Sequence, residues 1–298
     1  MSNVLLIGTK YYDLIVQRLK KELLQKAIEF IAVIDDPEYV YNDLNIKIYS
    51  IREISKLAKY VDYVIIADDN ITHFELAKEY FEETKIIKGR MIAYYVGFNW
   101  QDYLEFAQGN CTIISDSCLG GLLYNRFGRE FKSPLINTSV EKKDFLKLIG
   151  DLEYYLSAEL ELYQDRTSLS PPIGILNGEV KIGLNHYIDY MDAKKYWDRR
   201  RDRINYENIV ILMDSIETQE EINEFNQCIY NKKIAFVKKK IVAANTVYLP
   251  QYEDFSIRKE TGSYRGYIHR ITADNPRFPR PIDWLKLLNG KKDFVRLY

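Results

Sequence analysis

Short apolar runs alternate with helix-like segments through the first third of the chain. Each run has the composition of a strand that is buried on both faces of a parallel sheet. Between the first two runs, residues 12–27 carry leucine and isoleucine at helical spacing. The alternation predicts a parallel sheet with helices on both faces. We predict its strands over residues 3–8, 28–36, 46–48, 63–67 and 85–87.

The predicted helices of this part begin at recognisable caps. Ser50 precedes the segment 51–59, and Glu53 stands three residues later, which is the pattern of a capping box. A further helix is predicted from Thr72 to about Glu82, after the polar residues 68–70. A break at residues 108–110 indicates the end of the first domain.

The second part repeats the alternation less regularly. We predict two different α/β domains, over residues 1–106 and 107–298: the first is a Rossmann-like parallel sheet, the second mainly parallel. Asn177-Gly178 between two apolar segments is a strong hairpin signal. The chain from residue 251 looks less ordered. Strands are predicted over 112–114, 173–176, 180–187, 209–213 and 234–237, and helices from about 122, over 140–160, from 189 or 192, over 218–228 and over 282–288.

Composition and charge exclude several classes of partner. The 298 residues include 42 basic and 43 acidic side chains, so no overall charge favours nucleic acid or an anionic membrane. No apolar run is long enough to cross a bilayer. The three cysteines, Cys111, Cys118 and Cys228, have neither disulfide-like nor zinc-like spacing. Without a signal-peptide pattern at the N-terminus, we expect a cytoplasmic protein.

The glycine pattern of a dinucleotide site is incomplete. Gly8 follows the first strand, but Lys10 and Asp13 stand where the further glycines of GxGxxG belong. Asp35 and Asp68 end two strands at the sheet edge where such folds bind ligands. They are candidates for holding a ribose or a metal, with capping of the next turn as the alternative. Any cofactor therefore stays open.

Residues 115–121, SDSCLGG, are the main candidate for a binding loop. A strand that ends in small polar residues and glycines before a helix leaves backbone N–H groups for an anion. We therefore expect a phosphate-bearing small molecule here. The candidate phosphate-binding residues of the loop are Ser115, Asp116, Ser117, Gly120 and Gly121.

Two resemblances suggest a biological context. The segments VLLIG, FIAVIDD and YVIIADD resemble the small Rossmann-like domains that precede sugar acyltransferases and nucleotide-sugar enzymes of bacterial polysaccharide pathways. SDSCLGG, the Ser133-Pro134 that follows, and HY with AKKYWDRRRDRIN resemble a bacterial family of unknown function that is often labelled as exopolysaccharide-biosynthesis proteins, over residues 110–240. That family's loop has Asn-Cys followed by Trp-Gly-Gly, whereas Ser117 and Leu119 stand here in place of the Asn and the Trp.

Cys118 and His186 are the catalytic candidates. At a helix start Cys118 could gain thiolate character and act as a nucleophile, with burial in the core as the alternative. His186 ends a predicted strand and is a candidate base. No Ser-His-Asp order, HExxH motif or Walker loop is present, so the sequence does not specify a reaction.

Arginines and aromatic residues gather in the segment 193–205. Arg199 and Arg203 share a helix face and are candidates for phosphate recognition, with a solvent-exposed face paired to Asp198 and Asp202 as the alternative. Trp197 could supply an aromatic surface for a base or sugar ring. Asp214, after the strand 209–213, is expected to face the cleft that would hold the phosphate-bearing ligand.

These observations favour a transferase of surface-polysaccharide biosynthesis that uses a phosphate-bearing activated donor such as a nucleotide-sugar. A non-catalytic nucleotide-binding or assembly protein and an acyltransferase using Cys118 are the alternatives. The oligomeric state is left open.

Overall fold

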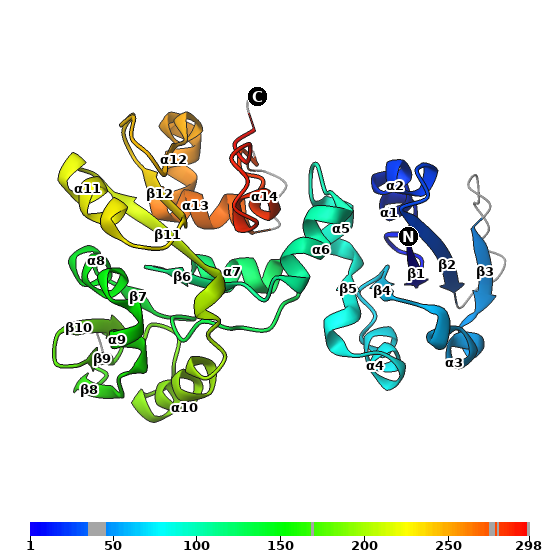
Figure 1. Ribbon diagram of the computed structural model, residues 1–298, viewed down its shortest axis with the longest axis horizontal. Helices are drawn as coiled ribbons and strands as arrows, with labels where there is room; N and C mark the ends of the chain where they lie inside the picture. Colours follow the sequence, from blue (N-terminus) through cyan, green and yellow to red (C-terminus); the bar gives the residue numbers. More distant parts are fainter. Residues whose placement is uncertain (35–45, 168–169, 274–277, 279, 297–298) are drawn as a thin grey trace. The chain divides into compact units, whose positions relative to one another are not determined.

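A strand forms at each place predicted in the first third in the computed structural model, which describes residues 1–34, 46–167, 170–273, 278 and 280–296. Residues 35 and 36 of the predicted strand 28–36 lie outside the described residues. The chain divides into two units (Figure 1). Unit 1 consists of residues 1–104 with 127–129, and unit 2 of residues 105–126 with 130–298. Both contain parallel sheets, so the predicted α/β class is confirmed.

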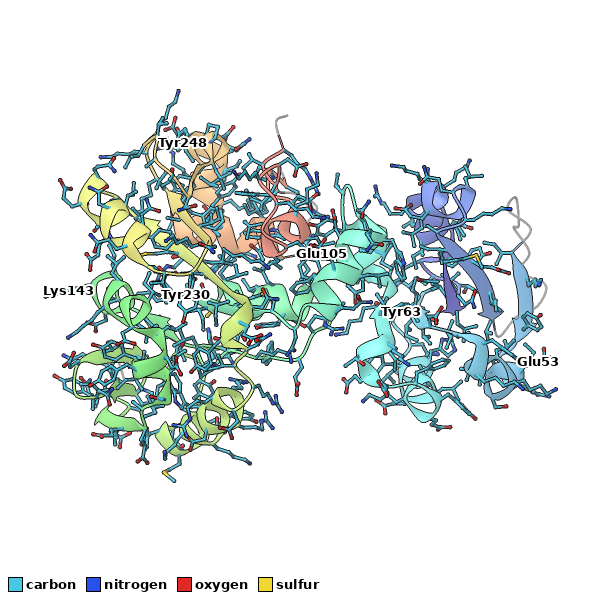
Figure 2. The ribbon with its side chains drawn as sticks, in the orientation of Figure 1. Glu53, Tyr63, Glu105, Lys143, Tyr230 and Tyr248 are labelled. Atoms are coloured by element: carbon cyan, nitrogen blue, oxygen red, sulfur yellow. The ribbon has the colours of Figure 1, made fainter. Side chains whose placement is uncertain are left out.

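The sheet of unit 1 has the strand order β3-β2-β1-β4-β5, and every neighbouring pair is parallel. This is the order of the doubly wound nucleotide-binding folds. Tyr63 begins β4 (Figure 2). The strands are β1 (Ser2–Ile7), β2 (Ile28–Ile34), β3 (Lys47–Ser50), β4 (Tyr63–Ile66) and β5 (Ile86–Lys88).

The helices of unit 1 are shorter than predicted. The helix predicted over 12–27 is interrupted at Leu19, whose ψ of 13° is not helical, and forms α1 and α2 instead. The capping box of Ser50 and Glu53 is confirmed, although it opens a 3-10 turn ahead of α3. The helices are α1 (Tyr12–Arg18), α2 (Lys20–Leu24), η1 (Ile51–Glu53), α3 (Ile54–Leu57), η2 (Ala58–Tyr60), α4 (Ile71–Tyr80), η3 (Glu83–Lys85), α5 (Gly89–Tyr94) and, at the boundary of the units, α6 (Trp100–Gln108).

The turn after β1 is closed by a side chain of unit 1 itself. Gly8 has a φ of +93°, and a Cβ atom at this position would lie 1.9 Å from Asp68 Oδ2. The Asp68 carboxylate also accepts a hydrogen bond from the N–H of Asn70 and pairs with His73 Nδ1 at 2.7 Å. A carboxylate therefore occupies the turn where doubly wound folds place phosphate groups.

Unit 2 contains a parallel sheet and an antiparallel sheet. The parallel sheet has the order β13-β12-β11-β6, and the antiparallel sheet β7-β10-β9-β8 was not foreseen as a separate layer. The predicted hairpin is confirmed: it joins β9 to β10, and Asn177 and Gly178 have the positive φ values that a tight turn needs. The strands are β6 (Thr112–Ser115), β7 (Ser139–Val140), β8 (Leu160–Gln164), β9 (Ile173–Leu176), β10 (Val180–Gly183), β11 (Ile209–Ile216), β12 (Lys232–Val237) and β13 (Thr246–Tyr248).

Two sequence predictions about the helices of unit 2 are wrong. The single helix predicted over 140–160 is two, because Asp151 leaves the helical conformation and caps α9 through Tyr154 N–H. The tail predicted to be loose contains two ordered helices, α12 and α13. The helices are α7 (Leu119–Arg126), α8 (Lys142–Gly150), α9 (Leu152–Ser157), α10 (Tyr190–Arg201), η4 (Tyr206–Asn208), α11 (Gln219–Gln227), η5 (Pro250–Glu253), α12 (Phe255–Thr261), α13 (Tyr264–Thr272) and α14 (Trp284–Leu288).

One continuous hydrophobic core joins both sheets of unit 2 to α8, α9, α10 and α11. Trp197 lies in this core and is 1% exposed. Helix α13 packs against α7 and β11. Among the helices that the structure describes, none has the length and hydropathy of a membrane span.

We expect Gly8→Ala to destabilise unit 1 by about 2 kcal/mol or more, because the positive φ and the contact with Asp68 both oppose a side chain. In an Asp68→Ala background the cost should fall to about 1 kcal/mol, which is the backbone contribution alone. Urea denaturation of the four proteins of this cycle measures both values. An equal cost in the two backgrounds would contradict the closed turn.

Candidate active site

Two buried carboxylates meet at the carboxyl edge of the parallel sheet in unit 2. Asp116 follows β6 directly, and Asp214 lies near the end of β11, the strand beside it, where Ser115 pairs with Leu212. Both side chains have no exposed surface. The backbone N–H of Asp214 lies 3.2 and 3.4 Å from the two carboxylate oxygens of Asp116. The two strand ends are thus joined through a side chain.

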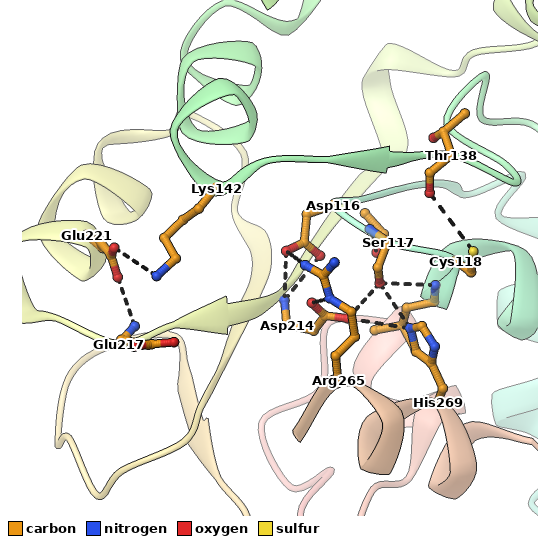
Figure 3. A network of polar contacts seen from close by, with 12 residues as sticks. Asp116, Ser117, Cys118, Thr138, Lys142, Asp214, Glu217, Glu221, Arg265 and His269 are labelled. Carbon is orange, nitrogen blue, oxygen red and sulfur yellow. Dashed lines mark hydrogen bonds and ion pairs between the residues drawn. The ribbon is translucent and has the colours of Figure 1, made fainter. Parts of the chain in front are cut away.

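Arg265 links the two carboxylates (Figure 3). Its Nε donates to Asp214 Oδ1 at 2.8 Å, and a terminal nitrogen donates to Asp116 Oδ2 at 3.3 Å. Burial tends to lower the pKa of Arg265, but Asp214 and Asp116 outweigh it and raise the pKa, so the guanidinium stays charged. The guanidinium compensates charges that would otherwise be buried alone.

Asp214 remains ionised despite complete burial. Burial alone would raise the pKa of its carboxyl group. The hydrogen bond with His269, the charge of Arg265 and the hydrogen bond from Ser117 together outweigh burial, and the pKa lies below its ordinary value of 3.8. Asp214 can therefore only accept hydrogen bonds.

Ser117 connects Asp214 to His269. Its Oγ lies 2.6 Å from Asp214 Oδ2 and 3.2 Å from His269 Nε2. Since the ionised Asp214 must accept, the hydroxyl donates its proton to Asp214, and we assign the hydrogen of His269 to Nε2, from which it is donated to Ser117. The Leu119 N–H also points at Ser117 Oγ, at 3.4 Å. The hydroxyl is therefore saturated with hydrogen bonds.

The helix α13 brings Arg265 and His269 to this edge. The two residues are four positions apart, so they lie on the same face of the helix. Ser263 caps the helix by accepting from the Gly266 N–H at 3.0 Å. The Arg265 side chain is 38% exposed and the His269 side chain 27% exposed, whereas the carboxylates beneath them are inaccessible. The site thus combines buried carboxylates with an accessible imidazole.

The structure brings together only part of the predicted site. Ser115, Asp116, Ser117 and Asp214 gather here, and Ser115 Oγ accepts from the Ser117 N–H at 3.3 Å. The predicted glycines belong to the helix that follows the loop. Gly120 and Gly121 lie inside α7 without a positive φ, and Cβ atoms there would lie 3.4 Å from Ile113 and Ile136.

The remaining candidates lie elsewhere. His186 is exposed, and its backbone N–H donates to the carbonyl of Asn137. Arg199 is exposed with its guanidinium 4.9 Å from the centre of the Tyr196 ring. The other predicted residues are accounted for as follows: Arg203 pairs with Glu130 at 2.8 Å, Trp197 is in the core, Asp68 is at the turn of unit 1, and Asp35 is outside the described residues.

Cys118 has the environment of a neutral thiol. It is half-buried, and its Sγ lies 4.0 Å from the carbonyl oxygen of Thr138. Burial raises the pKa of the thiol, and Arg265 only partly opposes this effect. A position next to the start of α7 is therefore not sufficient to produce a thiolate.

Arg265 and His269 were not found from the sequence. They lie in the part of the chain that looked loose, between prolines and polar residues. The usable signal was the segment 263–272, in which a serine cap precedes Tyr264, Tyr267, Ile268 and Ile271 at helical spacing. This spacing places the arginine and the histidine together on another part of the helix surface. Within the described ranges, no three His, Cys, Asp or Glu side chains form a set that could hold a metal ion.

Comparison with known proteins identifies the family. The model of the family described as "Domain of unknown function (DUF1919)" matches residues 90–273. The chain belongs to this family. Asp116, Ser117, Asp214, Arg265 and His269 all lie within the matched segment. The five-residue cluster is thus part of the DUF1919 region, whereas most of unit 1 lies outside it.

A relative is found in Haemophilus influenzae. A protein named "Uncharacterized protein" is 29% identical to this chain over 139 residues. The match covers 46% of this chain and 66% of the Haemophilus protein. Its name carries no activity, so the geometry of the cluster is the basis for the function proposed below.

We expect the stability of unit 2 to depend on pH through Asp214. Because its pKa in the folded state lies below 3.8, Asp214 contributes stability that is complete above this value and is lost as the pH falls through the folded pKa. Asp214→Asn should lower stability near pH 7. Below about pH 4, its urea midpoint should fall less steeply with decreasing pH than that of the wild type. The matched control is Asp202→Asn, at an exposed position. Its urea midpoint should change with acid pH as that of the wild type does. Identical acid limbs in wild type and Asp214→Asn would contradict the assignment.

The thiol of Cys118 should react slowly in the folded protein. Because burial raises its pKa, we expect alkylation by iodoacetamide near pH 7 at least about tenfold slower than that of a free cysteine. Peptide mapping of alkylated protein with and without urea measures the difference. Rapid alkylation of native Cys118 would instead indicate a thiolate nucleophile.

Proposed function

We propose that this chain is a transferase of bacterial surface-polysaccharide biosynthesis, in which His269 is the general base that activates an acceptor hydroxyl. The observation that carries the proposal is the connected series Asp214, Ser117 and His269, with distances of 2.6 and 3.2 Å. A buried carboxylate that fixes one nitrogen of an accessible imidazole leaves the other nitrogen to take a proton.

The assignment of hydrogens supports this role for His269. With its hydrogen on Nε2, the ring has a lone pair on Nδ1, and among the described residues no group forms a hydrogen bond with that atom. The lone pair on Nδ1 of a neutral imidazole can accept the proton of a substrate hydroxyl. Ser117 and Asp214 then stabilise the imidazolium, because the series ends in a negative charge.

The reaction would proceed by direct transfer. The acceptor hydroxyl attacks the anomeric carbon of the donor and loses its proton to His269 Nδ1. The new bond between the acceptor oxygen and the sugar forms as the bond to the phosphate oxygen breaks, and the phosphate group leaves with the electron pair. Ser117 is a positioning residue here, since its hydroxyl is saturated and only 2% of its surface is exposed.

The pathway and the donor rest on resemblance. SDSCLGG and AKKYWDRRRDRIN are similar to proteins labelled for exopolysaccharide biosynthesis, and an activated, phosphate-bearing donor such as a nucleotide-sugar is the corresponding substrate class. We place the reaction in the cytoplasm. The raised pKa of Cys118 weighs against an acyltransferase that uses this thiol.

A thermal-shift screen of nucleotide-sugars identifies the donor, because a ligand that binds the folded state raises its stability. Release of the phosphate-bearing leaving group in the presence of candidate sugar acceptors then measures transfer. We expect His269→Gln to lower the transfer rate by about 10² to 10⁴-fold with little change in donor binding, since the base acts on the acceptor.

His186→Gln is the matched control, because His186 is exposed and makes no described contact with the cluster. It should retain the wild-type rate. Full activity of His269→Gln, or an equal loss in both variants, would contradict the assigned base. A protein that binds a nucleotide-sugar but transfers it to no acceptor would favour the non-catalytic alternative.

A further inference from the structure

Three consecutive lysines lie at the carboxyl edge of the parallel sheet in unit 2. Lys238, Lys239 and Lys240 follow β12 directly, and all three are exposed. The loops at this edge of an open α/β sheet are where such folds bind ligands. The same edge holds Asp214 and the residues that contact it, so the lysines and the proposed base lie on one side of the sheet.

Four carboxylates at this side of unit 2 are held by cations other than Lys239 and Lys240. Glu217 forms an ion pair with Lys238, and Glu221 pairs with Lys142 at 3.0 Å and caps α11 (Figure 3). Asp116 and Asp214 are held by Arg265, as described above. Within the described ranges, Lys239 and Lys240 contact no carboxylate. As far as the described residues go, Lys239 and Lys240 are therefore two cations without an anionic partner.

The lysines follow the strand that lies beside the Asp214 strand. Strand β12 is the direct neighbour of β11, and Val237 pairs with Ile216, two residues beyond Asp214. At about 3.3 Å per residue, the first lysine lies one strand away from Asp214 and about 10 Å further along. Lysine carries its ammonium group on a long flexible stem, so the side chains of this loop can reach along the edge of the sheet.

Two N–H groups of the loop that the sequence favours for phosphate are already directed at hydroxyl groups within the loop. The Ser117 N–H is taken by Ser115 Oγ, and the Leu119 N–H points at Ser117 Oγ. The carboxylate of Asp116 lies in the same turn and shares Arg265 with Asp214, so this cation already serves two carboxylates. A phosphate-bearing donor needs cations at another place on this edge.

We propose that Lys239 and Lys240 bind the diphosphate of the donor, which directs the attached sugar toward His269. The inference rests on the proposed function for the identity of the donor, whereas the lysine site itself follows from the charges and the topology. Ammonium groups bind phosphate as point charges, and two of them at one loop match the two phosphates of a diphosphate.

Calorimetric titration of the full chain with inorganic pyrophosphate tests the site without any turnover. We expect Lys239→Ala/Lys240→Ala to weaken pyrophosphate binding by about tenfold or more, and to reduce the dependence of binding on salt. The control removes two positive charges elsewhere in unit 2: Lys195→Ala/Lys292→Ala, at two exposed lysines outside the edge loops. This control should retain the wild-type affinity.

The outcomes separate the lysine site from the proposed base. His269→Gln should bind pyrophosphate as wild type does while it loses transfer. An unchanged affinity in Lys239→Ala/Lys240→Ala, an equal loss in the control, or no binding by wild type would overturn the lysine site, whatever the transfer assay gives. Normal transfer by His269→Gln together with lost pyrophosphate binding in the lysine variant would overturn only the base.

Discussion

The ion bridge from Arg265 to two buried carboxylates is the interaction on which unit 2 depends at the carboxyl edge of its parallel sheet. Asp116 and Asp214 have no exposed surface, and two such charges on adjacent strands would repel each other strongly without a cation. The guanidinium meets both from above the sheet, because α13 packs against β11 and α7. The folded position of the C-terminal helices and the ionised state of the cluster are therefore coupled.

The same bridge also affects the polar groups around it. A carboxylate that stays ionised while buried is a strong hydrogen-bond acceptor, and Asp214 uses this property to orient Ser117. Ser117 in turn orients His269, whose ring reaches the surface. The exposed lysines 238–240 follow β12 at the same carboxyl edge of the sheet. Unit 1 uses a carboxylate differently, since Asp68 closes the turn at Gly8.

Much of the local structure could be predicted from the sequence. The buried strands, the capping box at Ser50 and the hairpin at Asn177-Gly178 all form, because each depends on side chains within a few positions of one another. The predictions that are wrong concern continuity. Leu19 and Asp151 interrupt helices whose apolar spacing continues through the break, since tertiary packing decides where a helix stops.

The sequence by itself determined the α/β class, the strand-to-helix loop at 115–121 and the presence of acidic residues at strand ends. Only the tertiary structure decided which of these residues meet. Ser117 is 97 positions from Asp214 and 152 positions from His269. No periodicity extends over such separations. The contacts exist because β6 and β11 are neighbours in the sheet and α13 packs against β11 and α7. This arrangement is set by the burial of apolar surface throughout unit 2 rather than by any local sequence pattern.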